Sequence, residues 1–421
     1  MSCAGNSHIE TPGLDRLARE GVRFDCAYSA FPLCVPARTA MFTGRMPHEC
    51  RVYDNHPPRD TGVPAPMLGR LMTDAGYESH YVGKWHILTV AQTDQAAHGF
   101  DNVVLGGGYG DLDSNKTKRA VEFLRKPRQK PFFLTVSYNN PHDCCELSRG
   151  DPLRMGDLPP PPEADDELPP LPPNHSIPEG EPEPLRAFQR AWSHILLANG
   201  WDERRTRRYL WGYYRLTEMV DREIGLLLDA LHAAGHADNT VIFFSSDHGD
   251  GHGCHRWNQK WSLYDESARV PLIVRSPDDN APAGRVCARP ASATLDLMPT
   301  LLDYAGAAIP PDCRGVSLRP IADGTGRIDR DTVFAETELR EPRSVPDFPC
   351  APGRMVRTER YKYTVYQQGG KRYEQLTDMV DDPGEMLNLA QDPRYASDLE
   401  AHRERLARWR RMTNDVRDVD T

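Results

Sequence analysis

Three short apolar runs, bounded by turn or polar residues, constrain the fold of this 421-residue chain more than any other feature. They cover residues 131–138, 240–246 and 270–274, and continuous apolar runs of this length are typical of strands buried on both faces of a parallel sheet. A long helical pattern lies between the first two, over 207–234, and Gly235 follows it. Strands that alternate with helices predict an α/β fold with a central, mostly parallel sheet flanked by helices.

Residues typical of helix ends and turns mark the bounds of the other expected elements. A helix over 12–20 is expected because Thr11 and Pro12 precede it and Gly21 follows it, and a second helix is expected over 66–74. Residues 151–184 are rich in proline and acidic residues, which predicts a semi-rigid surface insertion beside the substrate cleft; a partner-binding polyproline motif is the less favoured reading.

The C-terminal part has a different pattern. Strand-like pieces at 332–335, 354–358 and 362–366 precede a charged helix near 398–412. We therefore expect a large catalytic domain over 1–330, which contains the insertion, and a smaller α+β subdomain over 331–421.

Composition excludes several classes of protein. Hydrophobic residues make up 39% and charged residues 27%, as in ordinary globular proteins, and the net charge of -10 argues against a nucleic-acid binder. The basic runs Arg204-Arg205 and Arg207-Arg208 are read as solvated helix faces. Ten scattered cysteines do not form a disulfide pattern, so reduced thiols are expected.

Neither membrane nor export signals stand out. No stretch reaches the roughly 18 apolar residues of a membrane span, and residues 1–10 lack the features of a secretory signal. The chain as written is expected to be cytoplasmic, and a further N-terminal segment would make it periplasmic or secreted.

The stretch around Cys34 carries the most chemical information. Pro36 suits the first position of a helix, so Cys34 is expected just before a helix whose free N–H groups and dipole favour an anion, with Arg38 one turn further on. Taken alone, such a cysteine is structural or a thiol of lowered pKa.

One pair of polar side chains is expected directly after the second apolar run. Asp247 and His248 follow the run 240–246, where they could bind a metal or substrate or simply cap the loop. His248, His252, Cys254 and His255 could alternatively form a zinc cluster, but their spacing fits no common zinc module.

Two further histidines follow strand-like segments. Lys84 and His86 come after 79–82, and an extended backbone would place both side chains on one face, ready to contact an oxyanion. His142 lies in Asn140-Pro141-His142, just after the run 131–138.

Four motifs, in this order, resemble the sulfatase family of the alkaline phosphatase superfamily. They are Cys34-x-Pro36-x-Arg38 with Thr43-Gly44-Arg45, then Gly83-Lys84-Trp85-His86, then Asn140-Pro141-His142, and then Asp247-His248-Gly249 with Lys260 downstream. The resemblance extends over nearly the whole chain, to the segments 357–363 and 382–385. It implies an alkaline phosphatase-like sandwich and a Cys34 that a maturase oxidises to formylglycine.

The resemblance also assigns roles to these residues. One hydroxyl of the hydrated formylglycine attacks sulfur, and removal of a proton from the other expels sulfate. Arg38 would hold the diol, His86 would be the base, His255 would bind substrate, and the groups that neutralise the sulfate oxygens would be Lys84, His142 and Lys260. The residues expected to hold a divalent cation, Ca²⁺ with Mg²⁺ or Mn²⁺ as alternatives, are Cys34, Asp247 and His248.

One departure from the family keeps other functions open. Family members begin with a strand that ends in an acidic pair of metal ligands, and residues 1–6 match the segment after it. A sulfuric ester hydrolase acting on a sulfated small molecule or carbohydrate is the leading hypothesis. The alternatives are a phosphonate monoester or phosphodiester hydrolase and a catalytically impaired relative that binds an anion or a glycan.

Overall fold

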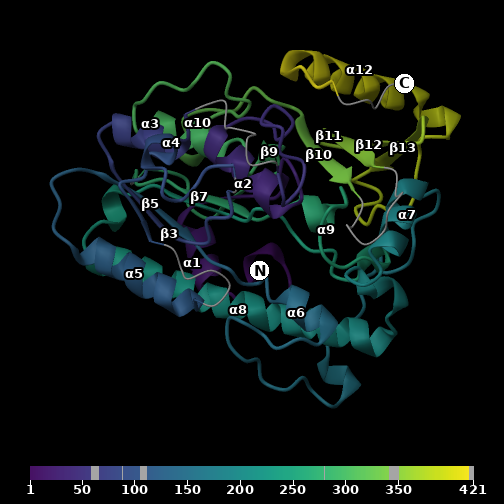
Figure 1. Ribbon diagram of the computed structural model, residues 1–421, viewed down its shortest axis with the longest axis horizontal. Coiled ribbons are helices and arrows are strands. Elements are labelled where there is room, and N and C mark those ends of the chain that lie inside the picture. The colour runs from purple at the N-terminus through teal and green to yellow at the C-terminus, as the bar shows by residue number, and fades with distance from the viewer. Residues whose placement is uncertain (58–65, 88, 105–110, 279, 341–349, 417–421) are drawn as a thin grey trace.

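Two adjoining sheets form the centre of the molecule, with helices on both sides (Figure 1). The computed structural model describes residues 1–57, 66–87, 89–104, 111–278, 280–340 and 350–416. The α/β fold predicted from the alternation of strands and helices is confirmed.

The first sheet is parallel, with the order β4-β3-β5, and it pairs Val82 of β3 with Val136 of β5. The second has the order β6-β7-β1-β8, and β7 runs antiparallel to both β6 and β1. The strands of the two sheets are β3 (Glu78–Gly83), β4 (Asn102–Val104), β5 (Phe132–Ser137), β6 (Ile242–Ser245), β7 (Leu272–Arg275), β1 (Val22–Phe24) and β8 (Arg285–Cys287). A short parallel pair, β2 (Ala27–Tyr28) and β9 (Ala291–Ser292), lies beside them.

Helices cover the sheets from two sides (Figure 1). One layer holds α1 (Pro12–Glu20), α5 (Asp113–Arg125) and α8 (Glu203–Ala233), and the other holds α2 (Cys34–Thr43), α3 (Leu68–Asp74) and α10 (Leu297–Tyr304). The shorter helices are α4 (Gln95–His98), α6 (Cys144–Arg149), α7 (Glu183–Ala191), α9 (Asp265–Ala268) and α11 (Arg319–Ala322). Short 3₁₀ turns occur at Ser2–Ala4, Asp165–Glu167, Leu197–Gly200, Ala237–Asn239, Cys254–Arg256 and Pro393–Tyr395.

The start of α1 is held in a way that the sequence did not indicate. Thr11 precedes the helix but makes no side-chain cap. The carboxylate of Asp221, on α8, accepts hydrogen bonds from the N–H groups of Gly13 at 2.9 Å and Leu14 at 2.8 Å. A distant acidic side chain therefore caps α1 and joins it to α8.

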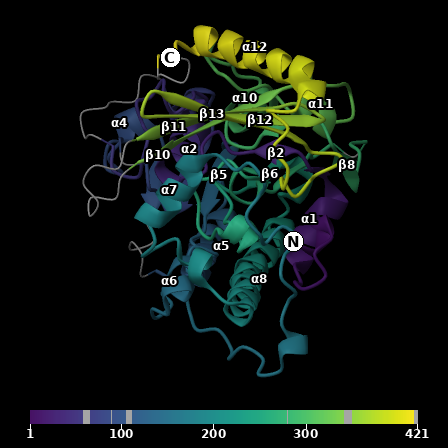
Figure 2. The same cartoon turned by 90° about the vertical axis from the view of Figure 1, so that its right-hand side faces the viewer.

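The C-terminal part forms a four-stranded antiparallel sheet covered by α12 (Figure 2). Its elements are β10 (Val333–Leu339), β11 (Ala351–Arg357), β12 (Tyr361–Gln368), β13 (Lys371–Asp378) and α12 (Ala396–Thr413). One apolar core contains Tyr28 and Trp257 together with Ala335 and Met355 of this sheet. The subdomain thus packs on the rest of the chain, and the boundary near residue 330 stays a prediction.

The acidic insertion at 151–184 is largely irregular, as predicted, and part of it contacts α8. Arg204 and Arg207 donate to the carbonyl oxygens of Glu163 and Pro169, each at 2.8 Å. These two arginines therefore anchor the insertion, which corrects the expectation of purely solvated basic faces. No described residue of 151–184 lines the cavity of about 1350 Å³ whose walls include Lys84, His248 and Lys260. The structure therefore does not place the insertion beside these predicted site residues.

Two expectations from composition can also be compared with the structure. All ten cysteines are free thiols. Among the described helices, none combines the length and the hydropathy that crossing a bilayer requires.

Candidate active site

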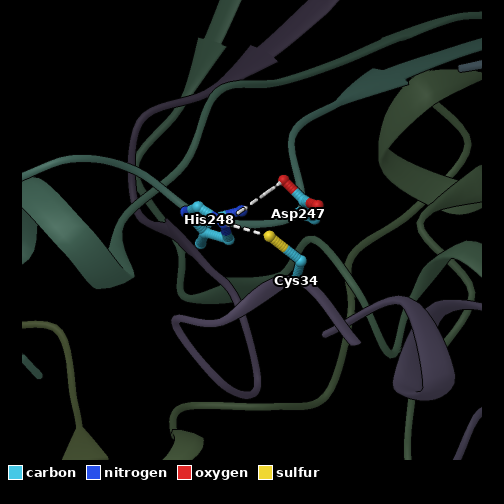
Figure 3. Close-up of side chains that lie close together, drawn as sticks. All are labelled: Cys34, Asp247 and His248. Carbon is cyan, nitrogen blue, oxygen red and sulfur yellow. Dashed lines mark hydrogen bonds and ion pairs between the residues drawn. The ribbon is translucent and has the colours of Figure 1, made fainter. Parts of the chain in front are cut away.

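Side chains from four separate segments meet at the first residue of α2. The Sγ atom of Cys34 lies 3.1 Å from Nε2 of His248, 3.6 Å from Nζ of Lys260 and 3.8 Å from Nζ of Lys84. Figure 3 shows that His248 lies near both Cys34 and Asp247, and Nε2 of its ring is 3.9 Å from Oδ1 of Asp247. Lys84 follows β3 and His248 follows β6, so the carboxyl ends of two strands supply this site, as is usual in open α/β sheets.

Cys34 is itself the first residue of α2, and Pro36 is the third, which shifts the predicted start of the helix by two residues. The Cys34 side chain is fully buried. The N–H group of Val35 already donates to Oδ1 of Asn55 at 3.0 Å, and Pro36 has no N–H group. The first turn therefore offers fewer free N–H groups to an anion than predicted, and the cationic side chains provide most of the attraction.

The charges around Cys34 favour an anion at this position. Burial alone would raise the pKa of the thiol, but Lys260, Lys84 and His248 outweigh it and hold the pKa well below its usual value. Burial likewise opposes ionisation of Lys260, yet the thiolate of Cys34 and the thiols that follow β5 raise the pKa of its ammonium group. The pocket is therefore built to hold negative charge beside Lys260.

Arg38 lies one helical turn after Cys34, as predicted. Its Nη2 atom donates to the carbonyl oxygen of Lys84 at 2.8 Å and to the hydroxyl of Ser137, and its Nε atom is 3.8 Å from Oδ2 of Asp247. Ser137 was not anticipated, because nothing in its sequence context distinguishes the last residue of a strand. Arg38 thus joins α2 to the ends of β3, β5 and β6.

The loop after β6 fixes Asp247 and His248. Nδ1 of His248 is 2.8 Å from the carbonyl oxygen of Gly249, which leaves Nε2 directed at Cys34. A Cβ atom on Gly249 would lie 1.9 Å from the carbonyl oxygen of Glu266, so only glycine fits after His248. Burial would raise the pKa of Asp247, but His248, Lys84 and Arg38 lower it overall, and the carboxylate is ionised.

Lys84 and His86 do not lie on an extended segment, which corrects the prediction. Strand β3 ends at Gly83, and His86 has a φ of 46°. The pair therefore lies in a turn anchored by Trp85, whose indole N–H donates to the carbonyl oxygens of Ile87 and Val90.

Of this pair, Lys84 reaches Cys34, whereas no hydrogen bond joins His86 to Cys34 among the described residues. The Nδ1 atom of His86 is buried and has no hydrogen-bond partner in the described part of the chain. Its role as the base stays a prediction.

His142 is held beside the site by a buried ion pair on α5. The carboxylate of Asp113 accepts from Nζ of Lys116 at 2.6 Å and from the N–H groups of Asn139 and Asn140 at 2.8 and 2.9 Å. Burial and the nearby ammonium groups of Lys84 and Lys260 lower the pKa of His142 to about 2, so the imidazole is neutral. The Asp-x-x-Lys spacing of the ion pair was the available signal, and the sequence reading missed it together with α5.

His255 has a structural environment. Its side chain is 1% exposed, its Nε2 atom is 2.8 Å from the carbonyl oxygen of Gly384, and its ring stacks on Tyr264 with centroids 3.9 Å apart. These contacts fix the loop that carries Lys260, and a contact between His255 and substrate stays a prediction.

A cation could be held where Cys34, Asp247 and His248 offer ligand atoms within 4.8 Å of one another. One carboxylate and one imidazole suit a divalent ion, but calcium prefers six to eight oxygen ligands. The described donors therefore supply only some of the ligands that a calcium ion needs. The modified side chain at position 34, water or substrate would supply the further oxygen ligands. The alternative zinc cluster is not formed by the described residues, since His252, Cys254 and His255 do not join this group.

Comparison with known proteins identifies the family. The sulfatase family model matches residues 1–307, and the model of the N-sulphoglucosamine sulphohydrolase C-terminal region matches residues 253–412. A Delta 4,5-hexuronate-2-O-sulfatase of Bacteroides thetaiotaomicron is 33% identical over 404 residues, which cover 93% of this chain and 81% of that protein. An N-acetylglucosamine-6-O-sulfatase of the same organism is 26% identical, over 94% of this chain and 81% of that protein.

Comparison with solved structures supports the same family assignment. A 2-O GAG sulfatase superimposes with a TM-score of 0.84 and 31% identity, over 99% of this chain and 89% of that one. The phosphonate monoester hydrolase of Agrobacterium radiobacter shares the fold, with a TM-score of 0.77 and 22% identity over 98% of this chain and 93% of that one. The chain belongs to the sulfatase family and has its alkaline phosphatase-like fold. It is a sulfatase, an enzyme that hydrolyses sulfate esters.

Proposed function

We propose that this sulfatase removes a sulfate ester from a carbohydrate and that its nucleophile is a formylglycine made from Cys34 by a maturase. The observation that carries the proposal is the position of Cys34, fully buried and within 3.8 Å of two ammonium groups. The Sγ atom stands where an oxygen of the modified residue would lie. The same positive charges that stabilise a thiolate would stabilise a deprotonated hydroxyl there.

The chemistry divides between the modified residue and the groups around it. When present, the formylglycine diol supplies one hydroxyl to attack sulfur and a second whose deprotonation releases sulfate. Lys84 and Lys260 face this position from two sides, so they neutralise the charge that develops on the sulfate oxygens, and the neutral His142 is limited to hydrogen bonding. Arg38 holds the end of β3 in place through the carbonyl oxygen of Lys84.

We propose Ca²⁺ as the cation, held by Asp247, His248 and the side chain at position 34, with Mg²⁺ or Mn²⁺ as alternatives. Bound there, it would polarise the ester and add positive charge next to the sulfate. The carboxylate of Asp247 and the hydroxyl oxygens that a formylglycine at position 34 would offer favour a hard cation, whereas the imidazole of His248 is an unusual ligand for calcium.

The substrate class follows from the relatives. Two of them are named for a 2-O-sulfated hexuronate and a 6-O-sulfated N-acetylglucosamine. The relative that is 33% identical covers most of this chain, so a 2-O-sulfated unsaturated hexuronate is the first substrate to test.

The experiment compares three substrates with protein produced together with a formylglycine-generating maturase. The substrates are an aryl sulfate, an aryl phosphonate monoester and a 2-O-sulfated unsaturated disaccharide. Mass spectrometry of the peptide that carries Cys34 measures the modification. We expect formylglycine at position 34, release of sulfate from the disaccharide and the aryl sulfate, and loss of turnover in Cys34→Ala.

Two results would contradict the proposal. A clear preference for the phosphonate would assign the alternative hydrolase activity, which shares the fold. Turnover that persists in Cys34→Ala would show that another nucleophile operates. The variant Cys350→Ala, which removes an exposed thiol far along the sequence, is the matched control and should keep full activity.

A further inference from the structure

The loop 250–260 carries Lys260 into the candidate active site. The Nζ atom of Lys260 lies 3.6 Å from Sγ of Cys34, and Lys260 is 7% exposed. Residues 250–260 are all described by the structure, and the 3₁₀ turn Cys254–Arg256 is the only regular element among them. Neither a long helix nor a strand fixes the lysine, so the contacts of the loop itself must set the position of its ammonium group.

The backbone of this loop is strained on both sides of Lys260. Left-handed backbone costs a residue other than glycine about 1–2 kcal/mol. Such a conformation persists only where the surrounding contacts over-determine it, and it is concentrated at functional sites. Among the described residues of 250–261, those other than glycine with a positive φ are His252 (52°), His255 (53°), Arg256 (59°), Gln259 (69°) and Trp261 (78°).

Gln259, the residue before the lysine, is held at three points. Its N–H group donates to Oδ2 of Asp250 at 2.9 Å, and its carbonyl oxygen accepts from the N–H group of Gly251 at 2.7 Å. Its Oε1 atom accepts from the thiol of Cys145 at 3.0 Å. Because Gln259 directly precedes Lys260, these three hydrogen bonds fix the direction in which the lysine leaves the loop.

The carboxylate of Asp250 bridges the two ends of the loop. Its Oδ1 atom accepts from the N–H group of His252 at 2.9 Å, and its Oδ2 atom accepts from that of Gln259, also at 2.9 Å. The hydroxyl of Tyr209, on α8, lies 2.9 Å from both oxygens. Asp250 is 3% exposed, and hydrogen bonds to a carboxylate are strong in such surroundings. One side chain therefore closes the loop and joins it to α8.

Tyr209 is a firm point of attachment for Asp250. It is 4% exposed, and its ring packs on Trp201 with centroids 4.9 Å apart. Burial raises the pKa of its phenol well above the usual value, so the hydroxyl keeps its proton and donates it to the carboxylate. A continuous set of hydrogen bonds thus leads from α8 to the residue that precedes Lys260.

Asp250 does not itself face the reacting position. It is the last residue of Asp247-His248-Gly249-Asp250, but the described residues that could hold a cation are Cys34, Asp247 and His248. Both of its oxygens already accept hydrogen bonds from within the loop and from α8. Any effect of Asp250 on the reaction therefore passes through the loop to Lys260.

We propose that Asp250 is a positioning residue for Lys260: its carboxylate closes the loop 250–260 against α8 and thereby holds the ammonium group where charge develops on the ester. The inference rests on the proposed role of Lys260 and adds the device that keeps this lysine in place. A misplacement of about 1 Å can cost about 10²-fold in rate, so the loss of Asp250 should lower kcat.

The test is a double-mutant cycle of Asp250→Asn and Lys260→Met in the maturase-modified enzyme. Asparagine keeps the size of the side chain but replaces one acceptor oxygen by an NH₂ group, so the N–H groups of His252 and Gln259 lose one acceptor. We expect Asp250→Asn to lower kcat about 10- to 100-fold and to change KM less than about threefold. In the Lys260→Met background, the same substitution should lower kcat less than about threefold, because the group that it positions is already absent.

Asp221→Asn is the matched control. The carboxylate of Asp221 also accepts one backbone N–H group on each oxygen, from Gly13 and Leu14, but it caps α1. This control should lower the melting temperature and leave kcat within about twofold of the wild type. If Asp250→Asn does not fold, Tyr209→Phe takes its place in the cycle, with an expected fall in kcat of about three- to tenfold that disappears in Lys260→Met.

Hydrogen exchange on the unmodified protein gives a readout that does not need turnover. The amides of 251–260 should exchange at least about tenfold faster in Asp250→Asn than in the wild type, because the loop opens more easily. In Asp221→Asn, the faster exchange should be found in 12–20 and not in the loop.

The cycle uses whichever of the three test esters the wild type hydrolyses fastest. A preference for the phosphonate would overturn the proposed function and leave this test intact. If the wild type hydrolyses none of them, the proposed function fails, and hydrogen exchange alone decides whether Asp250 holds the loop.

Non-additive losses of kcat together with faster exchange in 251–260 support the positioning role of Asp250. Three results overturn it: an equal loss of kcat from Asp250→Asn with and without Lys260, an equal loss in Asp221→Asn, or unchanged exchange in 251–260.

Discussion

At the scale of single residues, the site is defined by charge more than by any one nucleophile. Lys84 and Lys260 approach Cys34 from different loops, at 3.8 and 3.6 Å, and lower the pKa of its thiol against the effect of burial. A pocket that holds a thiolate in this way is also suited to a sulfate group. The electrostatic property can therefore be measured in the unmodified protein, separately from turnover.

Lys260→Met tests this property. Removing one ammonium group should raise the pKa of the Cys34 thiol, measured as the difference in thiolate ultraviolet absorbance between proteins with Cys34 and with Cys34→Ala. In the modified enzyme, kcat should fall about 10²–10³-fold. Lys371→Met, which changes an exposed lysine on β13, is the control and should alter neither quantity. An unchanged thiol pKa in Lys260→Met would contradict the electrostatic account.

At the scale of elements, the site depends on the backbone conformation at the end of β3. Gly83 has a φ of 107°, and a Cβ atom there would lie 2.1 Å from the carbonyl oxygen of Ser137. The same carbonyl accepts the N–H of Lys84 at 2.9 Å, so the turn and the position of the lysine are coupled. Strand propensity cannot provide such a turn, because only glycine tolerates both the conformation and the close approach.

Gly83→Ala should therefore lower both stability and activity. Gly76→Ala is the matched control, because Gly76 has a φ of 93° but no atom within 4 Å of the position of a Cβ atom. The control should lose about 1–2 kcal/mol of unfolding free energy from backbone strain alone. Gly83→Ala should lose more, with a clear drop in kcat, and equal losses in the two variants would show that the clash with Ser137 is unimportant.

At the scale of the whole molecule, buried ion pairs fasten the C-terminal subdomain to the catalytic part. Arg354 of β11 donates to Asp415 at 2.7 and 3.0 Å and lies 3.6 Å from Glu336, which in turn is 2.7 Å from Nδ1 of His48. A second network joins Lys362 of β12 to Asp265 and Glu385, each at 2.8 Å. Both networks connect segments that lie far apart in the sequence.

Arg354→Met should destabilise the protein by about 3–5 kcal/mol, because it leaves buried carboxylates without their partner. Urea unfolding measures the loss. Arg394→Met removes an exposed arginine from its pair with Asp392 and should cost less than about 1 kcal/mol. If the two variants were equally stable, the buried network would not contribute to holding the subdomain.

The second network should make stability depend on pH. Burial raises the pKa of Glu385 from 4.5 to about 7, although Lys362 opposes the shift. Because the folded-state pKa lies above the unfolded-state value, this stabilisation is fully present below pH 4.5 and is lost as the pH rises through 7. Compared with Glu385→Gln, the wild type should lose up to about 3 kcal/mol between these limits. Parallel unfolding curves for the two proteins across this range would contradict the assignment.

The sequence by itself determined the class of fold and located most of the residues that meet around Cys34. Apolar runs located β5, β6 and β7, because strands buried on both faces must be apolar throughout. The segment around Cys34 is recognisable by its resemblance to the sulfatase motif, and the residues after three strands are recognisable because the ends of strands in such sheets gather in one place.

Only the tertiary structure decided which predicted residues touch. His248 reaches Cys34 and His86 does not, and the ring of His255 packs against Tyr264. The backbone has a positive φ at His86 and at His255, and this conformation directs the two rings. Short motifs do not encode such backbone conformations. The contacts of Asp113 with the N–H groups of Asn139 and Asn140 and the cap that Asp221 provides for α1 also depend on segments that are distant along the chain. Local sequence fixes what each element is, whereas long-range packing fixes which groups face one another.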